Sequence, residues 1–431
     1  MVNNIHELLV QAQAAFDTAN WSLLSQHLQL LLSANSHDAE IVKNREYILQ
    51  LAISTLEMGD FQQRWEIAKV LKQLGNIAIP PLIDILQDEN AEENLRWYAV
   101  RILGELQQPE TIICLVDVLK TSDNDELKAM AAAALGEMGT GAIRALSQLL
   151  AEEETRLLAV RSLAYIRTPE TITPLLSVVQ DSQVAVRTTS LEALSSFHDP
   201  RITPVLLNAL DDVAPTVRRV AVLGLGFRRD LCAEFDLVKK LQPRLFDFNL
   251  DVCCAAAIAL SRMGTDEAAQ SLFQVLISLH TPLKLQLEII RALIWVETLS
   301  GLTYLHQALV QTTSEILWQE MITVLGQVEK PELIKPAGEI LLNVLQSPPD
   351  SMSVRMKSAI ACGLGELGYH EAMRALILLL EDDNQVVRLN AIAALKKLNQ
   401  EVAYQQLQQL AANSTLTPNL QQGIAIALAE W

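Results

Sequence analysis

The pattern of apolar and polar positions in this chain follows one short phrase, seen clearly in LRWYAVRILGEL, from Leu95 to Leu106. Ala99 lies three residues after Arg96, and Leu103 lies seven residues after it. In a helix these two offsets share one face, so the phrase predicts an amphipathic helix. We expect the small alanine to let a neighbouring helix approach closely, and the leucine to fill the space beside it.

The phrase recurs along the chain at nearly regular intervals. A leucine stands seven residues after each of twelve anchor positions, mostly 31 to 33 residues apart, and the next residue is usually Gly, Ala or Ser. A fixed period of this length is typical of a solenoid. The anchors are Arg64, Arg96, Lys128, Arg156, Arg187, Arg218, Cys253, Gln286, Trp318, Lys357, Arg388 and Gln421.

Each repeat is predicted to hold a first helix, a short acidic turn and a second helix that carries the phrase. First helices are predicted over 79–86 and 202–210, for example, and acidic turns at 122–125 and 381–384. An Asp or Asn in such a turn can cap the helix that follows. We therefore predict an all-α fold, a right-handed α-solenoid of about twelve stacked helix pairs.

The first part of the chain lacks the phrase. Amphipathic helices are predicted over 5–16 and 39–56, with Asn20 as the N-cap of a helix between them. Because a solenoid exposes apolar surface at both ends, its terminal units are atypical. We predict a helical N-terminal cap, weakly tetratricopeptide-like, over 1–60 and the repeat solenoid over 61–431.

The charge of the chain restricts its partners. With 33 Lys and Arg against 51 Asp and Glu residues, the formal net charge is −18. Nucleic acid and anionic membranes repel such a protein, so we expect neither as a partner. The chain starts without a basic segment followed by an apolar run, and it contains no uninterrupted apolar stretch long enough for a membrane span. We therefore expect no membrane insertion and a cytoplasmic location.

The strongest candidate for a binding site is a doubled phrase of tryptophan and basic residues. Trp65 is followed four residues later by Lys69, and Trp97 by Arg101, so each pair shares a helix face. Neighbouring repeats would place the two copies side by side on their second helices. Trp and Arg dominate binding hot spots. The alternative is that the indoles pack between repeats. The full candidate set is Arg64, Trp65, Lys69, Arg96, Trp97, Tyr98, Arg101 and Arg161.

Catalytic and metal-binding chemistry has little support in the sequence. Cys232, Cys253 and Cys254 could together hold zinc or an iron–sulfur cluster, but they match no C-x-x-C pattern, and core filling is the alternative. The chain has no H-E-x-x-H, phosphate-binding glycine loop or G-x-S-x-G elbow. We therefore expect no catalytic residues and no cofactor of its own.

Two stretches resemble a known family. VRRVAVLGLG, at 217–226, and VRLNAIAAL, at 387–395, are similar to the second helices of HEAT repeats, and the endings at 134–139 and 363–368 resemble the phycobilisome-lyase HEAT-like class. The helical start that leads into QQRWEIAKVLKQLG is similar to cyanobacterial HEAT-repeat proteins that partner an A-type iron–sulfur carrier. The resemblance covers about residues 61–431.

The resemblance implies two functions. The first is a non-enzymatic scaffold or adaptor that binds a protein on its concave face, with an iron–sulfur carrier or assembly protein as client. The alternative is a bilin lyase or chromophore chaperone for phycobiliproteins, in which Arg101 and Arg161 would face the propionates of the tetrapyrrole. In either case an iron–sulfur cluster or bilin would come with the client.

Overall fold

The computed structural model describes residues 5–35, 39–88, 90–346, 352–412 and 416–431, and the secondary structure of these residues is helical, with no strand. Its contacts divide the chain into two compact units, Met1–Ile202 and Thr203–Trp431. The all-α prediction is therefore confirmed. The predicted boundary at residue 60 stays a prediction.

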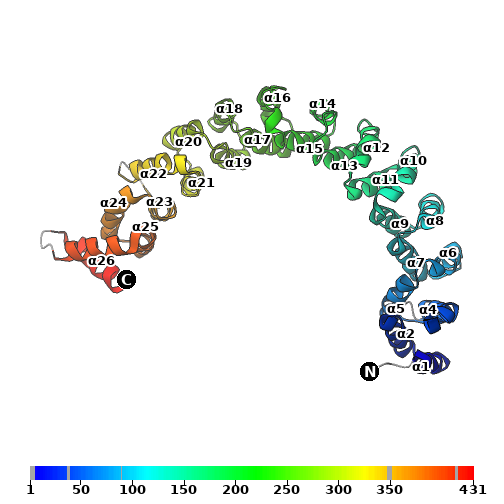
Figure 1. Ribbon diagram of the computed structural model, residues 1–431. Coiled ribbons are helices and arrows are strands. Elements are labelled where there is room, and N and C mark those ends of the chain that lie inside the picture. Colours follow the sequence, from blue (N-terminus) through cyan, green and yellow to red (C-terminus); the bar gives the residue numbers. More distant parts are fainter. Residues whose placement is uncertain (1–4, 36–38, 89, 347–351, 413–415) are drawn as a thin grey trace. The chain divides into compact units, whose positions relative to one another are not determined.

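The first unit consists of helices joined by short turns (Figure 1). Its α-helices are α1 (Ile5–Asp17), α2 (Trp21–Asn35), α3 (Ala39–Lys43), α4 (Arg45–Met58), α5 (Phe61–Leu74), α6 (Ile79–Gln87), α7 (Glu93–Leu106), α8 (Pro109–Thr121), α9 (Asp125–Glu137), α10 (Ile143–Leu149), α11 (Glu153–Ile166), α12 (Ile172–Leu176) and α13 (Val184–Ser195). Its short 3-10 helices are η1 (Gly75–Ala78), η2 (Gly139–Ala142) and η3 (Pro169–Thr171). Asn20 accepts a hydrogen bond from the Leu23 N–H at 3.2 Å, as predicted for an N-cap. The helix expected over 39–56 is broken at Asn44, which separates α3 from α4.

The second unit continues the same alternation. Its α-helices are α14 (Ile202–Ala209), α15 (Pro215–Gly226), α16 (Leu237–Leu241), α17 (Leu250–Met263), α18 (Asp266–Leu276), α19 (Leu283–Trp295), α20 (Leu299–Gln311), α21 (Glu315–Leu325), α22 (Pro331–Gln346), α23 (Val354–Glu366), α24 (Met373–Leu378), α25 (Gln385–Ala411) and α26 (Pro418–Ala429). Its 3-10 helices are η4 (Arg229–Leu231), η5 (Gln242–Phe246), η6 (His370–Ala372) and η7 (Leu379–Glu381). A non-helical residue, Asn399, divides α25 into two helices of successive repeats.

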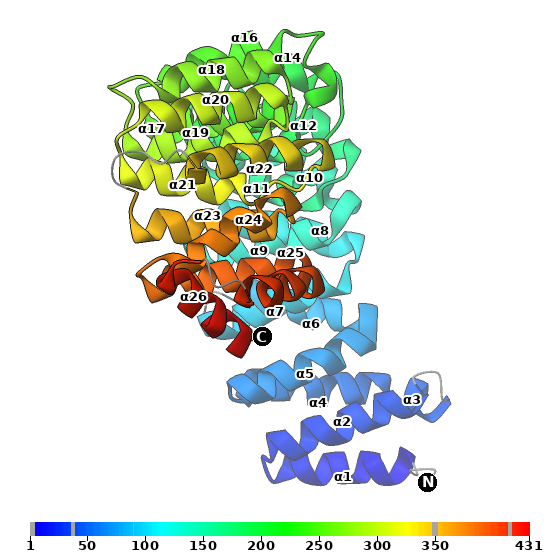
Figure 2. The ribbon, with the colours of Figure 1, turned by 90° about the vertical axis from the view of Figure 1, so that its left-hand side faces the viewer.

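Each unit has two layers of helices. The second helices, such as α7, α9 and α11, pack against one another along the row, and the first helices form the other layer. Figure 1 shows the second helices on the inner side of the bend of each unit. Figure 2 shows first helices α18, α20 and α22 of the second unit side by side. A residue on the exposed face of a second helix therefore lies on the inner side of its unit.

The repeated phrase makes the core. The residue three positions after each anchor is buried at every repeat, and the leucine seven positions after it is buried at all but Leu428, which is half-buried in the last helix. Small residues follow the leucine because the helices approach closely there. A Cβ added to Gly104 would lie 2.5 Å from the Cβ of Ala134 in the next second helix. The pattern thus predicts both the buried face and the tight contact between repeats.

The anchor residue closes the turn inside its own repeat. Five of the twelve anchor side chains donate a hydrogen bond to a backbone carbonyl six residues earlier, which satisfies a carbonyl left open near a helix end. These bonds run from Arg156 to Leu150 at 2.7 Å, Arg187 to Asp181 at 2.7 Å, Arg218 to Asp212 at 2.8 Å, Cys253 to Asp247 at 3.1 Å and Arg388 to Asp382 at 2.8 Å. Cys253 therefore keeps the bond although it breaks the basic pattern.

Several anchors also bind an acidic residue in the turn of the next repeat. Arg218 holds both carboxylate oxygens of Asp247, at 2.8 and 2.7 Å, and Lys357 holds Asp382 at 2.6 Å. Burial opposes ionisation of Asp247, but hydrogen bonds from Arg218 and from the Asn249 N–H outweigh it, so the pKa of Asp247 is lowered. The acidic turns therefore join successive repeats as well as capping helices.

Candidate functional site

The start of α5 fixes two exposed aromatic rings in the first unit. Asp60 caps the helix by accepting a hydrogen bond from the Gln63 N–H, and the Gln63 side chain accepts one from the Asp60 N–H, both at 2.9 Å. This capping box sets the direction of the first turn. Phe61 and Trp65, four residues apart, stack with ring centroids 6.5 Å apart, and they are 70% and 37% exposed.

Arg101 of α7 joins this pair to the next repeat. Its guanidinium carbon lies 3.6 Å from the centroid of the Trp65 ring and 5.9 Å from that of Trp97. The Glu105 carboxylate, one turn along α7, accepts a hydrogen bond from Arg101 Nε at 3.0 Å and holds it there. We call Phe61, Trp65, Trp97 and Arg101 the aromatic–arginine cluster. It presents two exposed rings and a cation whose position is already fixed.

Lys69 lies beside the cluster and is neutralised. Its ammonium group donates to Glu66 Oε2 at 2.8 Å, and Gln29 of α2 donates to the same carboxylate at 3.0 Å. These hydrogen bonds, that from Lys69 first, lower the pKa of Glu66. Because exposed pairs of this kind contribute little energy, Lys69 can still exchange Glu66 for a partner's carboxylate.

Three of the predicted site residues are directed away from this surface. Arg64 is 8% exposed and donates to the Glu57 carbonyl and to Glu92, both at 2.9 Å. Arg96 donates to the Leu86 carbonyl at 3.2 Å. Tyr98 is 1% exposed, and its hydroxyl donates to the Phe61 carbonyl at 3.0 Å. We remove all three from the candidate surface, because Arg64 and Arg96 close the turn and Tyr98 fills the core.

Arg161 is exposed on α11, apart from the cluster but on the same layer of second helices. Tyr165, four residues later, is 65% exposed, and its ring packs over Gly136 of α9, where an added Cβ would lie 3.2 Å from it. Sequence reasoning missed both Phe61 and Tyr165. Each stands four residues from a candidate, before Trp65 and after Arg161, so helical spacing alone could have found them.

The cysteines are dispersed among roles in the fold. Cys253 is buried and bonded to the Asp247 carbonyl, whereas Cys232 and Cys254 are half-buried. Burial raises the pKa of all three thiols, which disfavours the thiolate that binds metal. Within the described ranges, no group of three His, Cys, Asp or Glu side chains is placed to hold a metal ion. The structure thus does not assemble these three cysteines into a metal site within the described residues.

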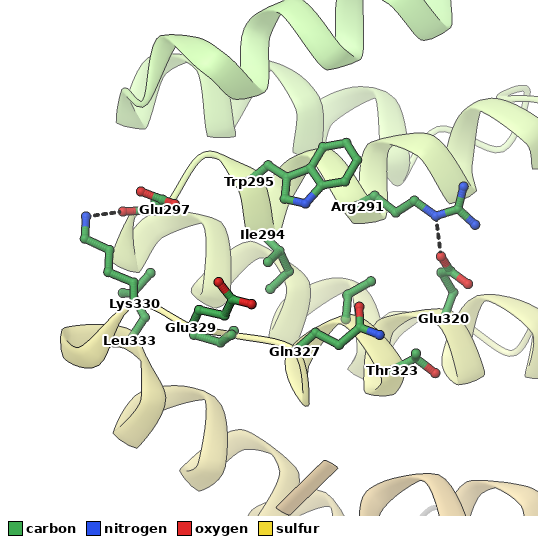
Figure 3. A pocket seen from close by; sticks show the side chains of 12 residues that line it. Arg291, Ile294, Trp295, Glu297, Glu320, Thr323, Gln327, Glu329, Lys330 and Leu333 are labelled. Atoms are coloured by element: carbon green, nitrogen blue, oxygen red, sulfur yellow. Dashed lines mark hydrogen bonds and ion pairs between the residues drawn. The ribbon is translucent and has the colours of Figure 1, made fainter. Parts of the chain in front are cut away.

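The second unit contains a cavity of about 710 Å³ between α19, α21 and the start of α22 (Figure 3). Trp295, at the end of α19, lines it and is 53% exposed. Arg291 at one end donates to Glu320 at 2.6 Å, and Lys330 at the other donates to the Glu297 carbonyl at 3.1 Å. Glu297 and Glu329 also line this space, which we call the Trp295 cavity.

The repeat geometry agrees with a family comparison. A model described as HEAT repeats matches residues 49–136, 79–154, 143–226, 203–283 and 338–429, more than half of the chain. The chain belongs to the HEAT-repeat family. A comparison of this HEAT-repeat chain with curated proteins finds no match. No helix among the described residues is long and apolar enough to cross a membrane.

Solved structures similar to this HEAT-repeat chain are helical solenoids. Kap121p, bound to the extreme C-terminus of the protein phosphatase Cdc14p, matches with a TM-score of 0.59 and 14% identity over 99% of this chain and 54% of its own. Kap95p, studied with RanGDP, matches with a TM-score of 0.52 and 13% identity over 89% of this chain and 60% of its own. This chain therefore spans about half the length of Kap121p. At such identities the likeness shows the fold alone.

Proposed function

We propose that this HEAT-repeat chain is a non-enzymatic adaptor that binds a protein partner through the second helices of its first unit. The observation that carries the proposal is the aromatic–arginine cluster, in which Arg101 stacks on Trp65 at 3.6 Å beside the exposed ring of Phe61. Two repeats contribute to it, so the stacking of the solenoid builds the site. Arg161 and Tyr165 extend the same surface along the first unit.

The chemistry of the cluster suits a protein surface. Rigid aromatic rings and an arginine held in place bury area on binding without much loss of side-chain freedom. The acidic chain as a whole favours partners with basic patches. Kap121p and Kap95p, which share the fold, are themselves named with protein partners. A protein partner fits these features better than nucleic acid does.

The resemblance in the sequence narrows the partner further. We propose an A-type iron–sulfur carrier or an assembly protein of that pathway, bound in the cytoplasm. In this proposal the client's own ligands hold the iron–sulfur cluster. This chain supplies only the binding surface on its inner side.

The test is affinity purification of the chain from its native host, followed by mass spectrometry and a binding titration with the partner recovered. Arg101→Glu should lower the affinity for the partner about thirtyfold, since losses at hot-spot residues are on the order of 2 kcal/mol. Arg144→Glu, which makes the same charge change on exposed Arg144 of α10 in the other layer, is the matched control. Equal affinities of the two variants would remove the cluster from the proposal.

The alternative function, a bilin lyase or chromophore chaperone, gives a different result in a simple experiment. Mixing the chain with free bilin should then shift the visible absorption spectrum, and addition of an apo-phycobiliprotein should transfer the chromophore. The adaptor proposal expects neither change. A shift that is lost in both Arg101→Glu and Arg161→Glu would favour the alternative.

A further inference from the structure

The Trp295 cavity differs from other aromatic sites of this chain in what covers the ring. Arg101 lies over Trp65, Arg262 lies 4.2 Å from the centroid of the Phe227 ring, and Lys396 lies 5.3 Å from that of Trp431. Trp295 is also exposed on a second helix. Within the part of the chain that the structure describes, no Lys or Arg covers its ring.

The arginine closest in sequence is held elsewhere. Arg291 precedes Trp295 by four residues, the same spacing that separates Trp97 from Arg101, so it stands within reach of the indole. Its guanidinium instead binds Glu320 of α21 at 2.6 Å and pairs with Glu288 of α19 at 3.7 Å. Figure 3 shows it directed toward Glu320 and away from Glu297 and Glu329. The other cation of the cavity, Lys330, is bound to the Glu297 carbonyl.

The remaining groups of the cavity have the charge of a site for a cation. Glu297 and Glu329 are exposed residues whose carboxylates share the cavity with Trp295, and Glu320 adds a third carboxylate at the Arg291 end (Figure 3). Three carboxylates against two cations leave the lining with a formal charge of −1. Ile294, Val324 and Leu333 supply apolar walls. A long side chain with an apolar stem and a cationic end matches this combination.

We propose that the Trp295 cavity binds an arginine or lysine side chain of a protein partner, with the cation on the indole face and near Glu297 and Glu329. Cation–π contact is strongest with Trp, and the overall charge of −18 draws basic segments toward the protein. The partner's cation would thus occupy the position that Arg101 occupies on Trp65 in the first unit. The inference rests on the proposed function only in taking a protein as the ligand.

The experiment titrates the full chain with three blocked tripeptides, Leu-Arg-Leu, Leu-norleucine-Leu and Leu-Glu-Leu, at low ionic strength. Binding is followed at the indole N–H signals of the six tryptophans, and Trp295→Phe identifies the signal of Trp295. The arginine peptide should move that signal with an affinity about tenfold higher than the norleucine peptide. Equal affinity of these two peptides, or tighter binding of the glutamate peptide, would overturn the proposal.

Variants separate the charge of the site from the charge of the protein. Glu297→Gln with Glu329→Gln should weaken the arginine peptide about tenfold and leave the norleucine peptide unchanged. Glu267→Gln with Glu332→Gln removes the same two charges from exposed residues outside the cavity lining and should change neither. Equal losses in the two double variants would reduce the effect to long-range attraction and end the proposal.

The indole itself is tested with Trp295→Leu, which keeps the site apolar and, at an exposed position, leaves the fold intact. Binding is then read from broadening of the peptide's own methyl signals, and we expect about a fivefold loss for the arginine peptide. Arg101→Glu, in the other unit, should not change tripeptide binding. If the peptide binds but no protein partner is recovered, the proposal for the Trp295 cavity stands and the adaptor proposal fails. If a protein partner is recovered but the peptide does not bind, only the proposal for the cavity fails.

Discussion

The aromatic–arginine cluster and the Trp295 cavity each contain an arginine at the same repeat position, but the two arginines bind different partners. Arg101 and Arg291 both stand five residues after their anchors, Arg96 and Gln286. Arg101 is held by Glu105 of its own helix and stacks on Trp65 of the previous repeat. Arg291 is held by Glu320 of the next repeat at 2.6 Å and also pairs with Glu288 of its own helix at 3.7 Å, so the ring of Trp295 stays uncovered.

The difference shows that a neighbouring carboxylate decides what a repeat position does. In the first unit the cation and the rings form one preassembled surface, which suits recognition by a partner's aromatic or acidic groups. In the second unit the arginine is drawn away, and the aromatic face is left for a cation from outside. Two repeats with similar backbones thus offer opposite halves of the same cation–π interaction.

The two sites can be compared only if the variants stay folded. Asp247→Asn shows how large a loss of folding stability is when an ion pair between repeats is broken. The side chains of Asp247 and Arg218 are largely buried, so removing the carboxylate leaves a desolvated cation and should lower the free energy of unfolding by about 3 kcal/mol at pH 7. Urea denaturation measures it. Asp251→Asn, at an exposed ion pair with Lys284, should have a much smaller effect.

The lowered pKa of Asp247 also fixes the pH dependence of that effect. Because the folded pKa lies below the unfolded value of about 4, the stabilisation is complete above that pH and is lost as the pH falls through the folded pKa. The stability of Asp247→Asn and the parent chain should therefore converge on acidification. A difference that persists undiminished at the lowest pH would assign the loss to packing instead.

The second prediction concerns the preassembled half of the comparison. Arg101→Lys keeps the charge but loses the planar group that stacks on Trp65 and the fixed bond to Glu105. We expect about a tenfold loss of partner affinity, smaller than for Arg101→Glu. Lys69→Arg, beside the cluster, is the control and should bind as the parent does. If Arg101→Lys binds normally, charge alone carries the interaction and the stacked geometry has no role.

The repeat pattern predicted the fold because core positions depend on local spacing. The residue three positions after each anchor and the leucine seven positions after it are buried throughout, apart from Leu428 in the last helix. The same recurrence should have excluded Arg64 and Arg96 from the binding site. A residue type that recurs at the same position in most repeats has a role in the fold of the repeat. Trp65, Trp97 and Arg101 break the pattern and lie on the surface.

The Trp295 cavity could not be predicted from the repeat pattern. Its aromatic ring lies nine residues after an anchor, and its carboxylates come from three separate segments that only the stacking of repeats brings together. Helical spacing places Glu288 within reach of Arg291, and the two pair at 3.7 Å, but the closer partner, Glu320, depends on how α21 packs against α19. The polar partners of a side chain were thus the least predictable feature of this molecule.

The third prediction concerns a variant in which Arg291 should cover Trp295 as Arg101 covers Trp65. Glu320→Gln removes the closer of the two carboxylates that pair with Arg291, the other being Glu288 at 3.7 Å, and the guanidinium can then turn toward Trp295 one helical turn away. The guanidinium would compete with a partner's cation, so Leu-Arg-Leu should bind about fivefold more weakly. Adding Arg291→Gln should restore the affinity. If the single variant binds as tightly as the parent chain, Arg291 does not control access to the ring.

The smallest expected effect comes from a glycine at position 297, which distinguishes the contribution of the Glu297 backbone to stability from that of its charge to binding. Glu297 has φ of +56°, a left-handed conformation that disfavours any side chain, and Gln107 shares it in the first unit with φ of +52°. Glycine at either position should raise the free energy of unfolding by about 1 kcal/mol. Glu297→Gly should also weaken Leu-Arg-Leu, by about the same factor as Glu297→Gln, whereas Gln107→Gly should leave peptide binding unchanged. A variant Glu297→Gly that gains stability and keeps full affinity would mean that Glu329 alone supplies the charge, and the cavity would then be a one-carboxylate site.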